Sequence, residues 1–467
     1  MHSRGKKIQS WIQPLVLGGL ALVVLILAVA GPTFGIRATA QGAQPGRQTG
    51  EQQGVASCAG STCHGRQEAN GPVVRQNELL TWQDPSSPSG AHSRAWQVLK
   101  QPRSIAIASR LGLGPAEAAP ACLACHADTA MPRGPRFQLS DGVGCETCHG
   151  AASGWLASHA AVGATHAANV SAGMRPLDQP RARAALCLDC HLGDEGDRFV
   201  THRMMAAGHP RLSFELDLFT TLQQHHDEDA DYRARKPVGA AMTTWAVGQS
   251  MAVERALRLY ARPDRGQDGV FPEFTFFDCR TCHRQFSDDP GFKVSNRTNE
   301  GRPIASGFPA FNDEGMLMLA AAARVVAPTE AKSFETASRA FHAAFMRDRA
   351  TSVQSATRLA DQANALGTVF ARTQFTRAQT FAVLADLLSG PAARRYTDYQ
   401  GGAQAVMAVD SLLNALVANG QLDRSRMAAL RPQIDRAYAL VRDANKWQPD
   451  AFRQALAQLN TSVGALK

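Results

Sequence analysis

Ten cysteines form five close pairs, and each second cysteine is followed directly by a histidine. The five motifs read Cys58-Ala-Gly-Ser-Thr-Cys63-His64, Cys122-Leu-Ala-Cys125-His126, Cys145-Glu-Thr-Cys148-His149, Cys187-Leu-Asp-Cys190-His191 and Cys279-Arg-Thr-Cys282-His283. No cysteine lies outside these pairs, and histidine occupies only 14 of the 467 positions. The pattern therefore indicates a chemistry that uses two sulfurs and one imidazole together.

Three chemistries use paired cysteines, and they make different demands on the sequence. Disulfides suit an exported chain but predict nothing about the residue after each pair. A tetrahedral zinc site needs two half-sites, and five half-sites do not pair off. C-type haem explains every feature, because two thiols add to the porphyrin vinyl groups and the adjacent histidine binds the iron from the proximal side. The four motifs with two intervening residues therefore predict four covalently bound haems.

The first motif has four intervening residues, so its loop must bulge, which Gly60 and Ser61 allow. We favour a fifth haem here, because a glycine follows its histidine as one follows the histidine of the third motif. The alternative is a disulfide between Cys58 and Cys63 beside an ordinary histidine.

Five six-coordinate irons would need five further axial ligands, and the chain has more free histidines than that. Eight histidines lie outside the motifs once His2 is set aside, and seven of them fall between residues 92 and 226. The candidates for distal ligation are His92, His159, His202, His209 and His225, with His226 as the alternative to His225. Mostly bis-histidine ligation is therefore predicted, with no iron forced to stay open.

The remaining histidines and two methionines are weaker candidates for iron ligands. Met204 and Met205 could compete with His202 as ligands, but we expect both to pack against porphyrin. His166 is a weak candidate. His342 lies on a late amphipathic helix far from any motif and is left out of the ligand set.

The N-terminus has the pattern of an export signal. Arg4, Lys6 and Lys7 precede an apolar run over Leu15–Ala30, and Ala38-Thr39-Ala40 is a plausible cleavage site. Residues 1–40 are therefore either a cleaved signal peptide or an uncleaved anchor in the inner membrane. Both place the rest of the chain in the periplasm.

The rest of the chain predicts a mainly α protein in two parts. Residues 41–55 are a Gln/Gly-rich linker, and residues 56–290 form a haem-cored cytochrome domain with short helices and loops. Residues 291–311 are a second linker, punctuated by glycine and proline. Residues 312–467 predict an antiparallel bundle of five or six helices with no metal or catalytic cluster, a packing or docking module.

Residues 55–290 resemble the cytochrome c-554 family of multihaem c-type cytochromes. The likeness rests on Gly142-Val-Gly-Cys145-Glu-Thr-Cys148-His149-Gly150, on Trp155 and His159, and on Ala207-Gly208-His209-Pro210-Arg211-Leu212 with Phe214-Glu215. The resemblance implies a compact cluster of mostly bis-histidine haems that passes electrons in the periplasm. The wide-spaced first motif and the long helical C-terminal part depart from the family pattern.

The predicted function is electron transfer between protein redox partners, because the chain has ligands for five irons and no evident substrate site. The alternative is a reductase of a small nitrogen-oxide-type substrate at one five-coordinate haem, although no C-x-x-C-K motif of the pentahaem nitrite reductases occurs. A third option is a structural subunit that docks a redox enzyme through the helical module.

The formal net charge of +9 does not indicate nucleic acid as a partner. Residues 1–40 contribute four positive charges and no negative ones, so a cleaved chain carries about +5. Each ferric haem adds about −1 through its two propionates, which brings a five-haem protein near neutrality. Much of the excess Lys and Arg is therefore expected to neutralise propionates.

Overall fold

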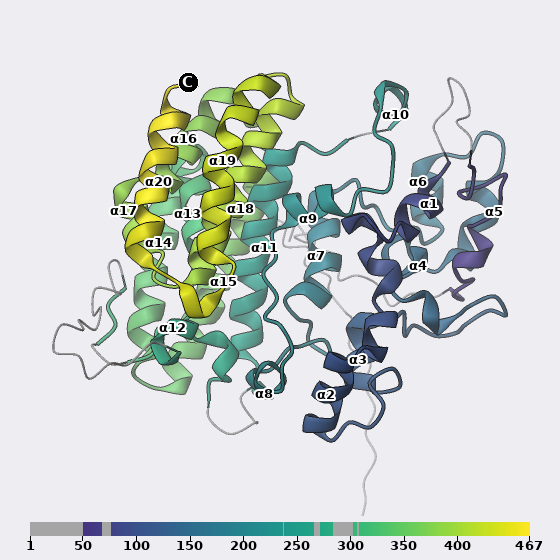
Figure 1. The fold of residues 1–467 in the computed structure, drawn as a ribbon, viewed down its shortest axis with the longest axis horizontal. Coiled ribbons are helices and arrows are strands. Elements are labelled where there is room, and N and C mark those ends of the chain that lie inside the picture. Colours follow the sequence, from purple (N-terminus) through teal and green to yellow (C-terminus); the bar gives the residue numbers. More distant parts are fainter. Residues whose placement is uncertain (1–49, 68–75, 237, 266–270, 284–301, 306–307) are drawn as a thin grey trace, which may run out of the picture. The chain divides into compact units, whose positions relative to one another are not determined.

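The computed structural model describes residues 50–67, 76–236, 238–265, 271–283, 302–305 and 308–467 (Figure 1). Over these residues the chain is mainly helical and has no β-strand, only isolated bridges between Gln52 and Arg133 and between Phe277 and Phe311. The prediction of a mainly α fold is confirmed. The predicted signal or anchor at 1–40, residues 41–49 of the linker at 41–55 and most of the linker at 291–311 lie outside the described residues.

The region of the cysteine motifs consists of short helices joined by turns. Its helices are α1 (Glu78–Gln83), α2 (Pro102–Leu111), α3 (Pro120–His126), α4 (Cys145–His149), α5 (Leu156–His159), α6 (His166–Ser171), α7 (Pro180–His191), α8 (His202–Ala206), α9 (Leu216–Leu222), α10 (Ala230–Arg235) and α12 (Cys279–Cys282). Proline is the first residue of α2, α3 and α7, where the missing amide hydrogen would have no helical acceptor. These helices are short, as the sequence predicts.

One helix of the predicted haem domain differs from the rest. Helix α11 (Ala241–Ala261) is 21 residues long, and Trp245 and Leu257 on it are fully buried. It packs along α15 (Arg349–Ala371) so closely that a Cβ added to Gly367 would lie 2.1 Å from the Ser250 Oγ. The expectation of only short helices before residue 290 is therefore wrong for α11, because its apolar face is covered by helices from the C-terminal part.

The C-terminal part is a bundle of helices. These are α13 (Glu314–Val326), α14 (Pro328–Phe345), α15, α16 (Arg377–Leu387), α17 (Gly390–Arg395), α18 (Tyr399–Ala418), α19 (Arg424–Val441) and α20 (Pro449–Gly464). The expected number of five or six is too low, because prolines in the first turns of α14 and α17, Pro328 and Pro391, begin additional helices. Residues 47–467 form one compact unit, and a domain boundary near residue 310 stays a prediction.

An apolar stripe on α18 lies at the centre of the bundle. Val406, Val409 and Leu413 are fully buried, and the helix ends where Gly420 takes a left-handed φ of 66°. Helix α16 begins with a capping box between Thr376 and Gln379. Local signals thus set the ends of these helices, and packing covers their apolar faces.

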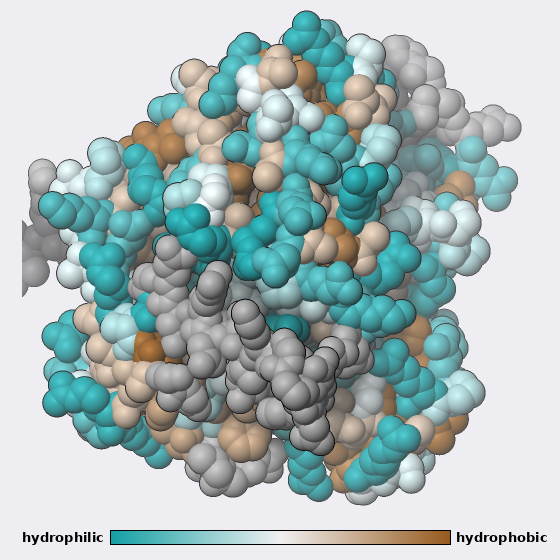
Figure 2. Space-filling model, turned by 60° about the vertical axis from the view of Figure 1, so that its left-hand side comes forward, coloured by the Kyte–Doolittle hydropathy of each residue, from teal (hydrophilic) through white to brown (hydrophobic). Residues whose placement is uncertain are grey.

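Helix α18 is long and apolar enough to cross a membrane by length and composition alone. Most of it is buried among the other helices of the bundle, so it has the character of a core helix. Figure 2 shows one face of the molecule, on which hydrophilic residues predominate and hydrophobic residues form small separate groups.

Candidate haem centres

Four of the five cysteine motifs lie on short helices. They form the end of α3, all of α4, the end of α7, and α12 with His283 directly after it. Residues three and four positions apart share one face of a helix. The two sulfurs and the histidine of each motif are therefore presented together, as attachment of one porphyrin requires.

The first motif is not helical. A 3-10 turn (Val55–Ser57) leads into a loop in which the His64 amide donates to the Cys58 carbonyl, with the N and O atoms 3.1 Å apart. Gly65 closes this loop, and an added Cβ there would lie 2.2 Å from the Ala59 carbonyl oxygen. The glycine after the histidine, noted in the sequence, is thus required by a close backbone approach.

Each motif histidine faces a histidine from outside the motifs. The pairs, with the separations of their ring centroids, are His64 with His159 at 5.9 Å, His126 with His209 at 6.5 Å, His149 with His225 and with His226 at 6.2 Å each, His191 with His92 at 6.2 Å, and His283 with His202 at 6.0 Å. Every distal candidate chosen from the sequence is in one of these pairs. The partners are up to about a hundred residues apart in the chain, so the tertiary fold selects them.

These separations fit a metal between the rings. Two imidazoles on opposite sides of one iron have centroids about 6 Å apart, because each metal–nitrogen bond is about 2 Å long. Directly hydrogen-bonded or stacked aromatic rings can lie closer; His225 and His226, which are neighbours in sequence, have centroids 4.2 Å apart. The donor set and its spacing therefore fit haem iron at five places.

Hydrogen bonds fix the tautomer of several of these histidines. Nδ1 of His126 lies 2.8 Å from the Ala95 carbonyl oxygen, and Nδ1 of His209 lies 2.7 Å from the Pro210 carbonyl oxygen. A carbonyl oxygen only accepts, so each Nδ1 is the protonated donor and each Nε2 keeps its lone pair. The lone pair on Nε2 is what a metal requires.

Burial keeps other histidines of the pairs neutral. It lowers the pKa of His149 to about 3 and the pKa of His191 to about 4, with neighbouring histidines adding to the effect. Burial also lowers the pKa of His225 to about 4. Neutral imidazole is the form that binds iron, so these sites are prepared for ligation near pH 7.

Thiol contacts connect motifs that are distant in sequence. The Cys58 and Cys145 thiols lie near enough to each other to affect each other's pKa, and so do the Cys125 and Cys190 thiols. The first motif is thus next to the third, and the second next to the fourth.

Two charged side chains that the sequence did not single out hold the motifs together. The buried Glu146, inside the third motif, accepts hydrogen bonds from the amides of Gln53, Gly54 and Ala152 at 2.9, 2.7 and 2.6 Å. Arg198 donates to the Ala124 carbonyl of the second motif at 2.8 Å and lies 3.7 Å from the carboxylate of Asp189 in the fourth. Such contacts between distant segments leave no local pattern that a sequence reading could detect.

The fifth motif lies against the helical bundle. Asp278, which caps α12, accepts a hydrogen bond from the Thr397 hydroxyl at 2.8 Å, just before α18. The Arg211 guanidinium lies 3.6 Å from the Cys279 sulfur. The buried Glu273 accepts from the His202 amide at 2.6 Å, which brings the start of α8 to this motif.

The weaker sequence candidates lie outside the pairs. His166 is exposed, with its Nε2 3.1 Å from the Asp178 carboxylate. His342 is fully buried in α14, with its Nε2 3.5 Å from the Asp313 carboxylate. Met204 and Met205 are half-buried on α8, the helix that begins with His202.

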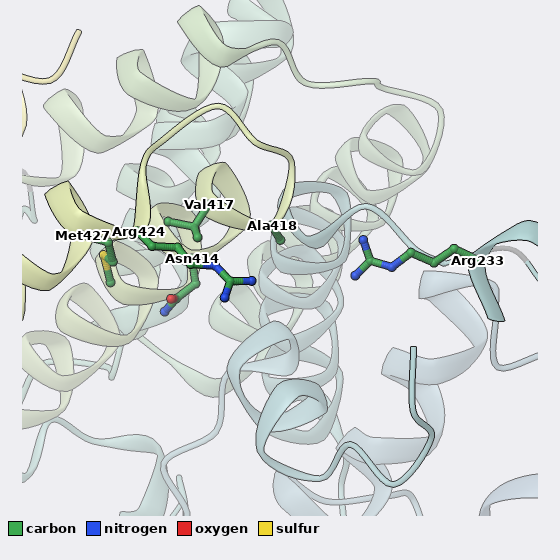
Figure 3. Close-up of a pocket in the computed structure, with 6 residues that line it drawn as sticks. All are labelled: Arg233, Asn414, Val417, Ala418, Arg424 and Met427. Atoms are coloured by element: carbon green, nitrogen blue, oxygen red, sulfur yellow. The ribbon is translucent and has the colours of Figure 1, made fainter. Parts of the chain in front are cut away.

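A separate open pocket of about 460 Å³ lies between α10 and the α18–α19 end of the bundle (Figure 3). Its lining comprises Arg233, Asn414, Val417, Ala418, Arg424 and Met427. None of these residues is a cysteine or histidine, so the pocket supplies no iron ligand.

The motifs and the facing histidines define a c-type cytochrome, a protein that carries haem c and transfers electrons. Residues 58–150 match the family described as cytochrome c554 and c-prime, and the chain is a c-type cytochrome that resembles this family. The match includes the first three motifs; the fourth and fifth motifs and the bundle lie beyond it. No curated protein and no solved structure matches the chain.

Proposed function

We propose that the chain is a periplasmic pentahaem cytochrome that passes electrons between protein partners through mostly bis-histidine haems. The observation that carries this proposal is the set of five motif histidines, each facing a second histidine at a centroid separation of 5.9–6.5 Å. A chain that saturates its irons favours outer-sphere electron transfer, because no coordination position is left for a substrate.

Bound haem supplies the one-electron chemistry, and the chain's own residues set its conditions. The motif cysteines anchor each porphyrin, and the facing histidines His92, His159, His202, His209 and His225 or His226 supply the distal nitrogens. The neighbouring Cys58 and Cys145, and likewise Cys125 and Cys190, favour short distances between haems. Electron transfer along the chain depends on such distances.

The periplasm is proposed because haem c is attached to exported chains and residues 1–40 have the pattern of a signal peptide or anchor. The redox partners would be proteins that dock near one haem. The fifth motif lies against the bundle, so a partner that docks on the bundle would lie near the fifth haem.

Electron paramagnetic resonance of the oxidised holoprotein tests the proposal. We expect only low-spin ferric signals, because two imidazoles give every iron a strong ligand field. A high-spin ferric signal that changes on addition of nitrite or nitric oxide would instead favour the reductase.

The wide-spaced first motif is tested by haem counting. Pyridine haemochrome analysis is expected to give five haems per chain for the wild type and four for the Cys58→Ala/Cys63→Ala variant, since these thiols attach the first porphyrin. Four haems in both the wild type and the variant would contradict a haem at the first motif and would favour the disulfide between Cys58 and Cys63.

A further inference from the structure

One carboxylate contacts the rings of two histidines that belong to different candidate haems. Glu78 is the first residue of α1, and only 9% of its surface is exposed. Its Oε2 lies 3.0 Å from Nδ1 of His64, the proximal histidine of the first motif, and its Oε1 lies 3.3 Å from Nδ1 of His226. Neither contact follows from a sequence motif.

The proton positions in this group follow from its geometry. Each carboxylate oxygen of Glu78 lies at one ring nitrogen, Oε2 at Nδ1 of His64 and Oε1 at Nδ1 of His226. A carboxylate oxygen accepts, so both Nδ1 atoms donate. Each histidine then keeps the Nε2 lone pair for iron.

The Glu78 carboxylate differs from the hydrogen-bond acceptors of two other candidate iron ligands. Nδ1 of His126 and of His209 donate to the neutral carbonyl oxygens of Ala95 and Pro210. A carboxylate draws the Nδ1 proton more strongly and makes the imidazole a more basic ligand. A more basic ligand stabilises ferric iron over ferrous iron and lowers the potential.

The first motif has a particular need for such a partner. In the other four motifs the short helix helps to orient the histidine, whereas His64 follows an irregular loop. Helix α1 lies against it twice, through the Glu78 carboxylate and through the Leu79 amide, which donates to the His64 carbonyl at 3.0 Å. Helix α1 therefore fixes both the backbone and the ring of this ligand.

We propose that Glu78 is the positioning residue of the first haem, and that its negative charge, acting through His64, lowers the midpoint potential of that haem. This inference rests on the proposed bis-histidine ligation. The same carboxylate holds His226 through its other oxygen.

The test is a redox titration of the holoprotein followed by electron paramagnetic resonance. The His64 and His159 rings are close to parallel, at 12°, whereas the rings of the second, third and fourth pairs are inclined by 62–87°. Near-parallel axial rings give a rhombic low-spin signal and near-perpendicular rings a more anisotropic one. The first haem is therefore expected to give the most rhombic signal, and the fifth, whose rings are inclined by 35°, a less rhombic one. In Glu78→Gln the midpoint of the most rhombic signal should shift to a higher potential, while the midpoints of the second, fourth and fifth haems, whose histidines have no described contact with Glu78, stay in place. The third haem should shift as well only if His226 is its distal ligand.

Asp178→Asn is the matched control, because Asp178 also pairs with a histidine, His166, but that histidine is in none of the five pairs. All midpoints should be unchanged in this control. An unmoved rhombic midpoint in Glu78→Gln, or an equal shift of every haem, would overturn the inference.

If pyridine haemochrome analysis shows that Glu78→Gln has lost the first haem, Glu78→Asp provides a second test of the inference. Aspartate retains the negative charge, but its shorter side chain places the carboxylate farther from His64. The hydrogen bond is then weaker, so the midpoint potential of the rhombic signal should lie above that of the wild type. A midpoint identical to the wild type would contradict a role for the contact. Failure of the proposed ligation itself would be recognised earlier, as the absence of a rhombic low-spin signal from the wild type.

Discussion

The full-length chain produced without haem attachment is expected to yield a protease-resistant fragment that begins just before α11 and extends to the C-terminus. The expectation follows from where the apolar core lies. The main buried cluster includes Trp245 on α11, Phe341 on α14 and Leu412 on α18, with most of its members on helices of the bundle. Burial of about 25 cal/mol per Å² of such surface offsets the entropy of ordering these helices.

Among the described residues, the region of the cysteine motifs has no comparable core of side chains. Its separate buried cluster consists of Leu99, Ala108 and Ala116. With porphyrin attached, the large apolar rings would complete this interior, but without them too little apolar surface is buried to order the chain. The region before α11 should therefore be cut rapidly in the haem-free protein.

The resistant fragment can be identified by limited trypsin digestion of the haem-free chain, followed by mass spectrometry. Arg233 on α10 precedes α11 and is exposed, so cleavage is expected after it, whereas the Lys236–Pro237 bond resists trypsin. The haem-loaded protein is the control and should resist at this position. A haem-free chain that remains intact from the first motif to the end would contradict the idea of a haem-filled core.

Replacement of His209 by alanine is expected to convert one haem of the five from low-spin to high-spin. His209 faces His126 with ring centroids 6.5 Å apart, and its Nδ1 donates to the Pro210 carbonyl. Alanine offers no nitrogen, so the iron at His126 would keep one protein ligand and an open sixth position. Electron paramagnetic resonance should then reveal a high-spin ferric signal, and the reduced protein should bind carbon monoxide at one haem per chain.

His166→Ala is the control for this prediction. His166 is exposed and pairs only with the Asp178 carboxylate among its described contacts, so its loss should leave all haems low-spin. If His209→Ala gave no high-spin signal and no carbon monoxide binding, His209 would not be the ligand opposite His126.

Much of the helical structure could be predicted from local sequence. The stripe of Val406, Val409 and Leu413 predicts α18, and Gly420 after Asn419 predicts its end, because these signals act within a few residues. Helix α11 was missed as a member of the bundle. Its sequence is apolar but gives no indication of which distant helices cover it.

The sequence allowed the candidate iron ligands to be recognised by residue type, but not which histidine faces which. Histidines are few, and those near the motifs stand out by type alone. His159 faces His64, and His92 faces His191. These pairings depend on the path of the loops through the folded chain, which no spacing of residues in the sequence predicts. Glu78 was missed altogether, since a single glutamate before an apolar stretch has no distinguishing pattern.

The sequence by itself determined the chemistry of this protein, because covalent attachment of haem needs two thiols and a histidine within a few consecutive residues. It also determined the supply of second ligands. Only the tertiary structure decided which histidines face each other, which motifs are neighbours and which carboxylate reaches His64. The physical reason is that these contacts join segments separated by tens to hundreds of residues, and their geometry is set by the packing of the whole chain.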